Sequence, residues 1–413
     1  MDSWSRWDLG SLGFPYCSDA NFYLLNSLNV MKNIILLGAT GSIGESCLNV
    51  IRQNKKEFNL LGIGLGSNLD KAHKIAQEFE PEHIFISESD LDNSHQLFRR
   101  YPRILNSENE LQQLIQDSNV DIVVSAISGF AGLKASYFAI DAGKTILVAN
   151  KESIVAAGDI LIPLAEAKNS NIIPVDSEHN AIHQCLPPYR NLDEVAKIII
   201  TASGGPFKDK TFKELAEVSL QDALKHPTWN MGTKITIDSA TLVNKCLELI
   251  EAHHLFQIPE SKIEIVLHPQ SIIHSMVTFI DGSTMAQLSN PNMEVPIANA
   301  LGLGRRLPIN FEPIHFSGLS FSFEPIPEGR EVIFEIAREV CNQGGNLGVI
   351  FNAANEVAVE SFINKKINFV DIYRVIERTF NSFPCSKLNT LDDVFEYDKE
   401  ARIQAEKVIK SIS

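Results

Sequence analysis

The feature that most constrains the fold is an alternation of apolar runs and helical patterns over residues 31–175. Each run has the length of a buried strand, and segments with helical periodicity separate the runs. Because β and α elements that alternate in this way form parallel sheets with right-handed crossovers, the sequence predicts a doubly wound α/β domain. The expected strands are residues 34–37, 60–65, 83–86, 121–124, 145–148 and 171–175.

The first of these runs is followed directly by a glycine-rich turn at residues 38–44, and a helical pattern begins at Glu45. In this context a glycine pattern indicates phosphate binding, because glycines allow close backbone approach and the helix N-terminus favours an anion. A plain tight turn is the alternative, since glycine turns are frequent in proteins of this class.

The end of the strand expected at residues 60–65 bears on the choice between NAD and NADP. A dinucleotide fold that prefers NAD places an Asp or Glu here, where it binds the ribose hydroxyls. This chain has Gly66, Ser67 and Asn68 at that point, and Asp70 comes later. The absence of an acid favours NADP, with Ser67 and Asn68 able to donate hydrogen bonds to its 2′-phosphate.

Two carboxylates, Asp176 and Glu178, follow the apolar run at residues 171–175. They would lie at the carboxyl end of a buried strand, where open α/β sheets bind ligands. If strand geometry persists, both side chains point to one side, and a divalent cation would remove their repulsion; oxygen ligands suit Mg²⁺ or Mn²⁺. The alternative is an Asp or Ser cap that opens a helix.

Further polar groups stand after expected strands and in a loop. Lys151 follows the strand at residues 145–148, where it could meet nicotinamide or substrate oxygens; a solvated lysine near a helix start is the alternative. Ser203 and two glycines follow the next apolar run, and hydroxyls beside glycines suit a phosphate cradle. Trp229 and Met231 occupy a loop bounded by Gly and Pro, which indicates either a closing lid or a hydrophobic anchor.

A helical pattern over residues 238–248 places Asn244, Lys245 and Glu248 on one face. A mere surface ion pair between Lys245 and Glu248 is the alternative, but a polar row inside an amphipathic pattern fits a site better. From Glu331 to the end the chain has helical periodicity, after a linker rich in proline.

Composition excludes several classes of function. The net charge of −15 argues against a surface for nucleic acid or for anionic membranes, and no apolar run reaches the roughly 20 residues of a membrane span. None of the six cysteines forms a CxxC pair, so no zinc knuckle or disulfide framework is indicated and a reducing cytoplasm fits best. Residues 1–30 lack periodicity and the marks of a signal or transit peptide; we expect a disordered extension or a start-site artefact.

Together, five of these motifs closely resemble the 1-deoxy-D-xylulose 5-phosphate reductoisomerase family of the non-mevalonate isoprenoid pathway. They are residues 38–44, 149–153, 175–182, 203–207 and 238–248. The glycine motif is unspecific, whereas Asp-Ser-Glu-His-Asn together with Ser-Gly-Gly-Pro-Phe is highly specific. The resemblance runs from about Met31 to the C-terminus and implies rearrangement and NADPH-dependent reduction of 1-deoxy-D-xylulose 5-phosphate to 2-C-methyl-D-erythritol 4-phosphate.

The resemblance implies a homodimer and a division of each chain into parts. The expected parts are a Rossmann-like NADPH-binding domain at residues 31–175, a central α+β catalytic domain at 176–305, a linker at 306–330 and a C-terminal α-helical domain at 331–413.

It also implies roles for individual residues. Metal ligands for Mg²⁺ or Mn²⁺ would be Asp176, Glu178 and Glu248. The substrate phosphate would be held by Ser203, Ser239, Asn244 and Lys245. The rest of the substrate would meet Ser177, Lys151 and His226, with Trp229 and Met231 in the closing loop and His274 nearby. The cofactor contacts would be Thr40, Gly41, Ser42, Ile43, Gly66, Ser67, Asn68, Asn150, Glu152 and Gly232.

One departure concerns Ser67, because many family members look to have a basic residue at this position; the NADPH preference depends on it. Two rival functions also stay open. An ordinary NADP-dependent dehydrogenase of the semialdehyde or homoserine type would have no need of three metal carboxylates. A non-enzymatic NADP-sensing module would leave both the metal and phosphate clusters without a use.

Overall fold

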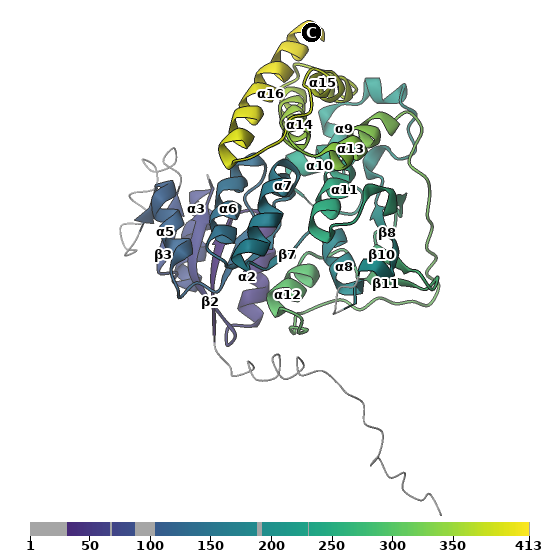
Figure 1. Ribbon diagram of the computed structural model, residues 1–413. Helices are drawn as coiled ribbons and strands as arrows, with labels where there is room; N and C mark the ends of the chain where they lie inside the picture. The colour runs from purple at the N-terminus through teal and green to yellow at the C-terminus, as the bar shows by residue number, and fades with distance from the viewer. Residues whose placement is uncertain (1–30, 67, 87–103, 188–191, 230, 413) are drawn as a thin grey trace, which may run out of the picture.

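The computed structural model describes residues 31–66, 68–86, 104–187, 192–229 and 231–412, which form two sheets and a group of C-terminal helices (Figure 1). The expectations for residues 1–30 and for Ser67 lie outside the described residues. In Figure 1 the larger sheet and its helices lie at the left, the smaller sheet at the right, and the C-terminal helices at the top.

The larger sheet is parallel, with seven strands in the order β4-β3-β2-β1-β5-β6-β7. Its strands are β1 (Lys32–Leu37), β2 (Phe58–Leu65), β3 (His83–Ile86), β4 (Ile104–Leu105), β5 (Ile122–Ser125), β6 (Thr145–Val148) and β7 (Ile172–Pro174). The doubly wound prediction is confirmed, although the two-residue β4 was not predicted. The strand order reverses between β1 and β5, which is the switch point where such sheets bind ligands.

Helices cover both faces of this sheet and bury two separate apolar cores. They are α2 (Ser42–Gln53), α3 (Leu69–Phe79), α5 (Glu108–Gln116), α6 (Leu133–Asp141) and α7 (Lys151–Lys168). One core, around α2 and α3, also takes in Ile297 and Leu301 from a much later helix, α12 (Glu294–Gly302). Asn49 of α2 donates a hydrogen bond of 2.9 Å to Glu294 of α12, so the late helix is fixed to the early domain.

The smaller sheet has the order β11-β10-β8-β9, with β8 parallel to β9 and antiparallel to β10. Its strands are β8 (Val195–Ala202), β9 (Ile263–Leu267), β10 (Ile273–Phe279) and β11 (Thr284–Leu288). The apolar run that precedes Ser203 forms β8, whereas β9 was not predicted. Helix α8 (Ser177–Cys185) packs on β10 and β11.

The helix expected from Asp238 to Glu248 is wrong as a single element. The chain forms α10 (Thr233–Thr241) and α11 (Val243–Phe256), with Leu242 between them at φ 64°. The Thr241 hydroxyl accepts a hydrogen bond from the Val243 N–H at 3.3 Å, and so satisfies a donor that the break exposes. The Leu242 side chain is buried, and this burial offsets the cost of the strained backbone at the break.

The C-terminal part is helical, as predicted, with a long buried helix at its centre. The helices are α13 (Glu331–Gln343), α14 (Leu347–Ile363), α15 (Asp371–Phe380) and α16 (Leu391–Ile412). α14 contacts α15 and α16 and also α7 of the first domain, which explains why it is apolar on nearly all sides.

Shorter helices occur earlier in the chain. They are α9 (Leu220–Ala223) and the 3₁₀ turns η2 (Phe130–Gly132), η3 (Leu192–Glu194), η4 (Gly205–Phe207), η5 (Glu214–Glu217) and η6 (Glu260–Lys262).

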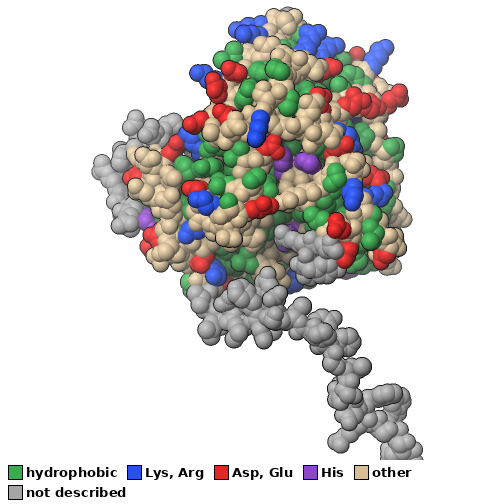
Figure 2. All heavy atoms as spheres, viewed as in Figure 1, with side chains coloured by type: hydrophobic (Ala, Val, Ile, Leu, Met, Phe, Trp, Pro, Cys, Tyr) green, Lys and Arg blue, Asp and Glu red, His purple; other side chains and the backbone are tan. Residues whose placement is uncertain are grey.

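Among the described residues, no helix is long and apolar enough to cross a membrane. Figure 2 shows acidic and basic side chains interspersed on one face of the molecule, without a continuous basic surface on that face.

Candidate functional site

A cavity of about 630 Å³ lies between the two sheets, at the carboxyl ends of the large sheet's strands. Ala126, Ala149 and Val175 line it, and these residues directly follow β5, β6 and β7. The opposite wall comes from β10, α10 and α11. The cavity therefore stands where open α/β sheets bind ligands, and it joins both expected domains.

Three carboxylates meet on one wall of the cavity. Asp176, Glu178 and Glu248 each offer an oxygen, and these oxygens lie within 4.8 Å of one another. The expected strand geometry at Asp176 and Glu178 is wrong, because Asp176 is the N-cap of α8 and accepts a hydrogen bond from the Glu178 N–H at 3.2 Å. The helix cap and the cluster coexist, since the first turn of α8 still turns both acids toward α11.

Two buried lysines neutralise much of this negative charge. The Lys151 Nζ lies 2.5 Å from Asp176 and 3.1 Å from Glu248, while Lys245 pairs with Glu178 and, at 2.5 Å, with Glu248. Burial would lower the pKa of Lys151, but the carboxylates of Asp176 and Glu248 raise it well above its ordinary value. Burial would raise the pKa of Asp176, but Lys151 holds it well below the usual range.

The donor set fits a small divalent cation. Burial, followed by repulsion from Glu178, raises the pKa of Glu248. Three carboxylates face two lysine ammonium groups, which leaves one negative charge in excess. A group of three hard oxygen donors with excess negative charge is the chemistry that Mg²⁺ or Mn²⁺ requires.

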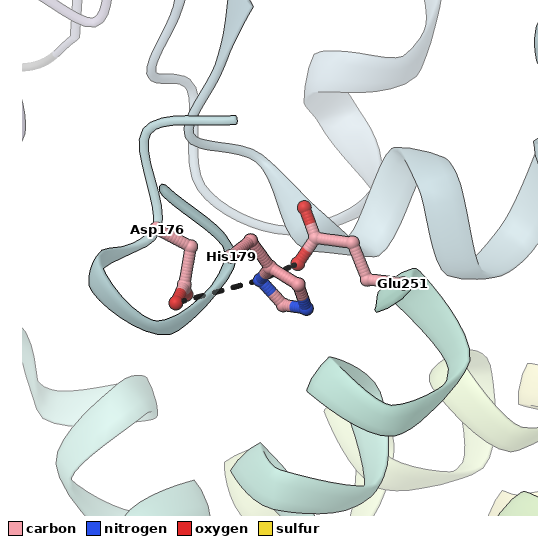
Figure 3. A group of neighbouring side chains, drawn as sticks. All are labelled: Asp176, His179 and Glu251. Carbon is pink, nitrogen blue, oxygen red and sulfur yellow. Dashed lines mark ion pairs between the residues drawn. The ribbon is translucent and has the colours of Figure 1, made fainter. Parts of the chain in front are cut away.

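Asp176 also belongs to a second group behind this cluster, and its other two members, His179 and Glu251, are fully buried and were not singled out from the sequence (Figure 3). His179 Nδ1 lies 3.5 Å from Asp176 and 3.2 Å from Glu251, and His179 Nε2 faces the Glu248 carbonyl oxygen at 2.8 Å. Burial would lower the pKa of His179, but Glu251 and Asp176 raise it to about 9. Glu251 stands three residues after Glu248 on α11, and this spacing was the available signal.

The four residues expected to hold the phosphate, Ser203, Ser239, Asn244 and Lys245, also line the cavity. His226, which was expected to meet the rest of the substrate, lines it beside them. Ser203 Oγ lies 3.1 Å from His226 Nε2 and accepts a hydrogen bond from the Gly205 N–H at 3.2 Å. Gly205 has φ 64°, and a Cβ there would meet the Ser239 carbonyl oxygen at 2.8 Å, so only glycine lets the two segments approach.

His226 is held in a defined neutral state. Its Nδ1 accepts hydrogen bonds from the N–H groups of Trp229, at 2.9 Å, and Thr228, at 3.2 Å. The Nε2 atom therefore carries the proton and donates to Ser203 Oγ. Burial, with a smaller effect of Lys245, lowers the pKa of His226 to about 4.

The loop residues Trp229 and Met231 line the cavity, together with Gly232, at the start of α10. His274 also lines it, and its Nε2 lies 2.9 Å from Ser289 Oγ. The structure therefore brings the expected loop residues and His274 to the same cavity as the carboxylates.

The cofactor residues divide into two groups. Ser42, Ile43, Glu152 and Gly232 line the cavity, as does the substrate residue Ser177. The other described members lie outside its lining and are Thr40, Gly41, Gly66, Asn68 and Asn150. The Asn68 side chain accepts a hydrogen bond from the Lys71 N–H at 3.1 Å and so caps α3.

The glycine turn nevertheless fits a dinucleotide. Gly38 has φ 85°, and a Cβ there would lie 2.3 Å from the Ala126 carbonyl oxygen. A Cβ on Gly44 would lie 2.4 Å from the Gly38 carbonyl oxygen, so the helix start packs directly on the turn. These are the close approaches for which a dinucleotide-binding turn uses glycine, and they occur at the β1–β5 switch point.

The sequence also did not single out Lys234, which lines the cavity near Glu152. Its Nζ lies 2.9 Å from Glu152 and 2.8 Å from Asp238. The spacing of four between Lys234 and Asp238 was a weak signal, because such helix pairs are common on surfaces.

Comparison with known proteins bears directly on this site. Three family models match consecutive parts of the chain: "1-deoxy-D-xylulose 5-phosphate reductoisomerase" at residues 34–158, "1-deoxy-D-xylulose 5-phosphate reductoisomerase C-terminal domain" at 172–256 and "DXP reductoisomerase C-terminal domain" at 288–404. The chain is 41% identical over 385 residues to 1-deoxy-D-xylulose 5-phosphate reductoisomerase of Francisella tularensis subsp. novicida (strain U112), with 91% of this chain and 98% of that protein covered. It is 43% identical over 374 residues to the protein of the same name from Bacillus cereus (strain AH187), with 90% and 98% covered.

Solved structures agree with these sequence matches. A DOX-P reductoisomerase in complex with NADPH, fosmidomycin and magnesium has a TM-score of 0.87 at 37% identity, covering 92% of this chain and 99% of that one. The 1-deoxy-D-xylulose 5-phosphate reductoisomerase of Zymomonas mobilis, in complex with NADPH, has a TM-score of 0.86 at 40% identity, covering 92% and 100%. Identity at this level over nearly the whole length, on the same fold, places the chain in the 1-deoxy-D-xylulose 5-phosphate reductoisomerase family.

Proposed function

We propose that this chain converts 1-deoxy-D-xylulose 5-phosphate to 2-C-methyl-D-erythritol 4-phosphate, with NADPH as hydride donor and a divalent cation. The observation that carries the proposal is the cavity itself. Three carboxylates, the side chains that we expect to hold the substrate phosphate and the start of the glycine-turn helix all line it. The solved relatives with NADPH and magnesium support the same cofactors here.

Asp176, Glu178 and Glu248 are the residues that would hold Mg²⁺ or Mn²⁺. The ion, when bound, supplies Lewis-acid polarisation of the substrate's carbonyl and hydroxyl oxygens, and NADPH supplies the hydride that reduces the rearranged aldehyde. The carbon skeleton rearranges either by cleavage and re-formation of a carbon–carbon bond or by a direct shift.

The phosphate end of the substrate would be held by Lys245 and Asn244, with the hydroxyls of Ser203 and Ser239 as further donors. Lys245 is buried, and its pKa is raised because Glu178 and Glu248 outweigh the effect of burial, so it stays cationic. The neutral His226 offers its Nε2 proton beside Ser203. Because the phosphate itself does not react, the binding energy of this end of the substrate can orient the reacting carbons.

Lys151 would act near the reacting atoms as a hydrogen-bond donor rather than as a base. Its raised pKa keeps it protonated, and its Nζ also contacts Asn244 at 2.9 Å. A protonated amine in this position can donate to a substrate oxygen on which negative charge develops. Ser177 would contact the substrate from the first turn of α8. Trp229 and Met231 would cover the cavity and exclude water.

The direct test is a spectrophotometric assay of NADPH oxidation with 1-deoxy-D-xylulose 5-phosphate and Mg²⁺. The expected result is metal-dependent oxidation that is faster with NADPH than with NADH. Turnover that persists in chelator would favour a semialdehyde or homoserine type of dehydrogenase. NADPH binding without any turnover would favour a sensing module.

Assembly and location belong to the same proposal. We infer a homodimer, supported by large apolar side chains that are exposed in the single chain: Ile280, Met285, Phe311, Phe316 and Phe323. A cytoplasmic location is supported by the cysteines, since the five in the described residues are all free.

A further inference from the structure

Lys234 is the cation between two nearly buried carboxylates on the cofactor side of the cavity. Its Nζ lies 2.9 Å from Glu152 Oε1 and 2.8 Å from Asp238 Oδ2. Glu152 opens α7 after β6, and Asp238 lies in α10, so one side chain joins two walls of the cavity. Asn150 is a second side chain that donates a hydrogen bond to Glu152.

Amide groups hold the remaining oxygens of both carboxylates. Asn150 Nδ2 donates to Glu152 Oε2 at 3.0 Å and to the Gly129 carbonyl oxygen at 2.8 Å. Asn355 Nδ2, from the buried helix α14, donates to Asp238 Oδ1 at 2.9 Å. Each acid is therefore fixed by one amide and by the shared lysine, and Lys234 closes the chain of contacts between them.

These hydrogen bonds continue along α14 and end next to Gly129, where they began. Glu356 follows Asn355, and its Oε1 accepts a hydrogen bond from the Phe130 N–H at 2.9 Å. Arg402 of α16 holds the other oxygen of Glu356 at 2.5 Å. The contacts thus form a ring through the β5–η2 segment, the start of α7, the start of α10, and α14. Glu152, Lys234 and Asp238 of this ring line the cavity.

We propose that Lys234 is a positioning residue for the cofactor: it orients the Glu152 carboxylate on the cavity wall and fixes the C-terminal base of the loop that carries Trp229. The inference rests on the proposed NADPH binding. A carboxylate held in this way is a defined acceptor for an amide N–H group of a bound nicotinamide. Lys234 stands two residues after Gly232, so the loop ends where the ion pair begins.

The charge states of Lys234 and Glu152 support the proposed positioning role. Burial would raise the pKa of Glu152, but Lys234 brings it below the ordinary value, so Glu152 is an ionised acceptor. Without Lys234, Glu152 and Asp238 would be two nearly buried carboxylates that share no cation, and they would move apart or take up protons. Lys234 itself would act only through Glu152 and Asp238.

The test is a double-mutant cycle in NADPH binding, read by cofactor fluorescence on the full chain without substrate. Lys234→Met should raise the dissociation constant for NADPH by about 10- to 100-fold, which is the size of loss that removing an outer-shell partner causes at metal sites. In the Glu152→Gln background the same lysine change should cost less than about twofold, because the carboxylate through which Lys234 would act on the cofactor is gone, although Asp238 remains. Lys197→Met, which removes a surface ion pair with Glu264, is the matched control and should bind as the unaltered chain does.

The outcomes separate this inference from the proposed function. If the unaltered chain fails to bind NADPH, the proposed function falls and this inference with it. If that chain binds but Lys234→Met binds equally well, or the lysine change costs the same in both backgrounds, only the positioning role is overturned. Should Lys234→Met fail to fold, Lys234→Gln, which keeps an amide donor toward both acids, replaces it with the same two outcomes.

Discussion

The indole ring of Trp229 faces the imidazole of His274, with ring centroids 6.2 Å apart and planes inclined at 59°. Trp229 belongs to the loop before α10, whereas His274 belongs to β10 of the smaller sheet. The contact spans the cavity, so the loop already reaches the sheet that it would have to cover. It is held there by one half-exposed ring rather than by burial in a core.

Replacing Trp229 by alanine should therefore impair catalysis more than folding. We expect kcat/KM to fall by about 100-fold, because a substrate that is poorly covered and positioned loses this much. NADPH affinity and the melting temperature should stay close to those of the unaltered chain. Limited proteolysis gives a second measurement, with cleavage in the loop expected to slow when NADPH, metal and a phosphonate are present. Loss of stability without loss of catalysis would identify the indole as an anchor.

Turnover and metal binding should depend strongly on the negative charge of the three clustered carboxylates. Asp176→Asn, Glu178→Gln and Glu248→Gln should each lower kcat by at least about 1,000-fold, since each removes a charged oxygen ligand without changing its shape. Calorimetric titration with Mn²⁺ should detect weaker binding in all three. Asp222→Asn, an exposed carboxylate before the loop, is the control. Unchanged Mn²⁺ affinity in the three variants would remove the proposed site.

The imidazole of His254 should make stability depend on pH. Burial lowers its pKa from 6.5 to about 4, although Asp159 acts in the opposite direction from 3.9 Å. Between these values the unfolded chain binds a proton that the folded chain does not, so the stabilisation present above pH 6.5 is lost as the pH falls. The contribution is at most about 3 kcal/mol. Urea unfolding at pH 7 and pH 5 should show it, and His254→Gln should have a smaller pH difference than the unaltered chain. An identical pH difference would exclude this histidine as the cause.

The exposed apolar side chains predict self-association. Phe311 is 69% exposed and Phe316 62% exposed, both in the segment between α12 and α13. The double variant Phe311→Asp, Phe316→Asp should shift a dimer toward monomer in sedimentation velocity, because charge at a buried interface is unfavourable. Ile403→Asp, on the exposed side of α16, is the matched control. A single chain that sediments as a monomer before any substitution would refute the dimer.

Elements with strong periodicity were predictable, and those fixed by distant contacts were not. The alternating apolar runs gave β1 to β3 and β5 to β7 because buried parallel strands are apolar throughout. At Asp176 the predicted strand geometry was wrong, although the expected carboxylate cluster formed. A helix cap and a strand end can both direct a carboxylate to the same cavity wall. The break at Leu242 depends on burial that no local pattern records. The partners Lys234 and Glu152 are 82 residues apart, so their contact was beyond sequence reasoning.

The attachment of α12 to the first domain has a consequence for synthesis on the ribosome. The core around α2 needs Ile297, Leu301 and Leu307, which the ribosome adds only after the whole smaller sheet has been made. Until then, the apolar face of α2 lacks its covering, and contacts so distant in sequence are slow to form. A nascent chain that stalls after β7 would therefore expose this face and would be a substrate for chaperones. A domain whose sheet precedes the smaller sheet in the chain is therefore completed only after that sheet.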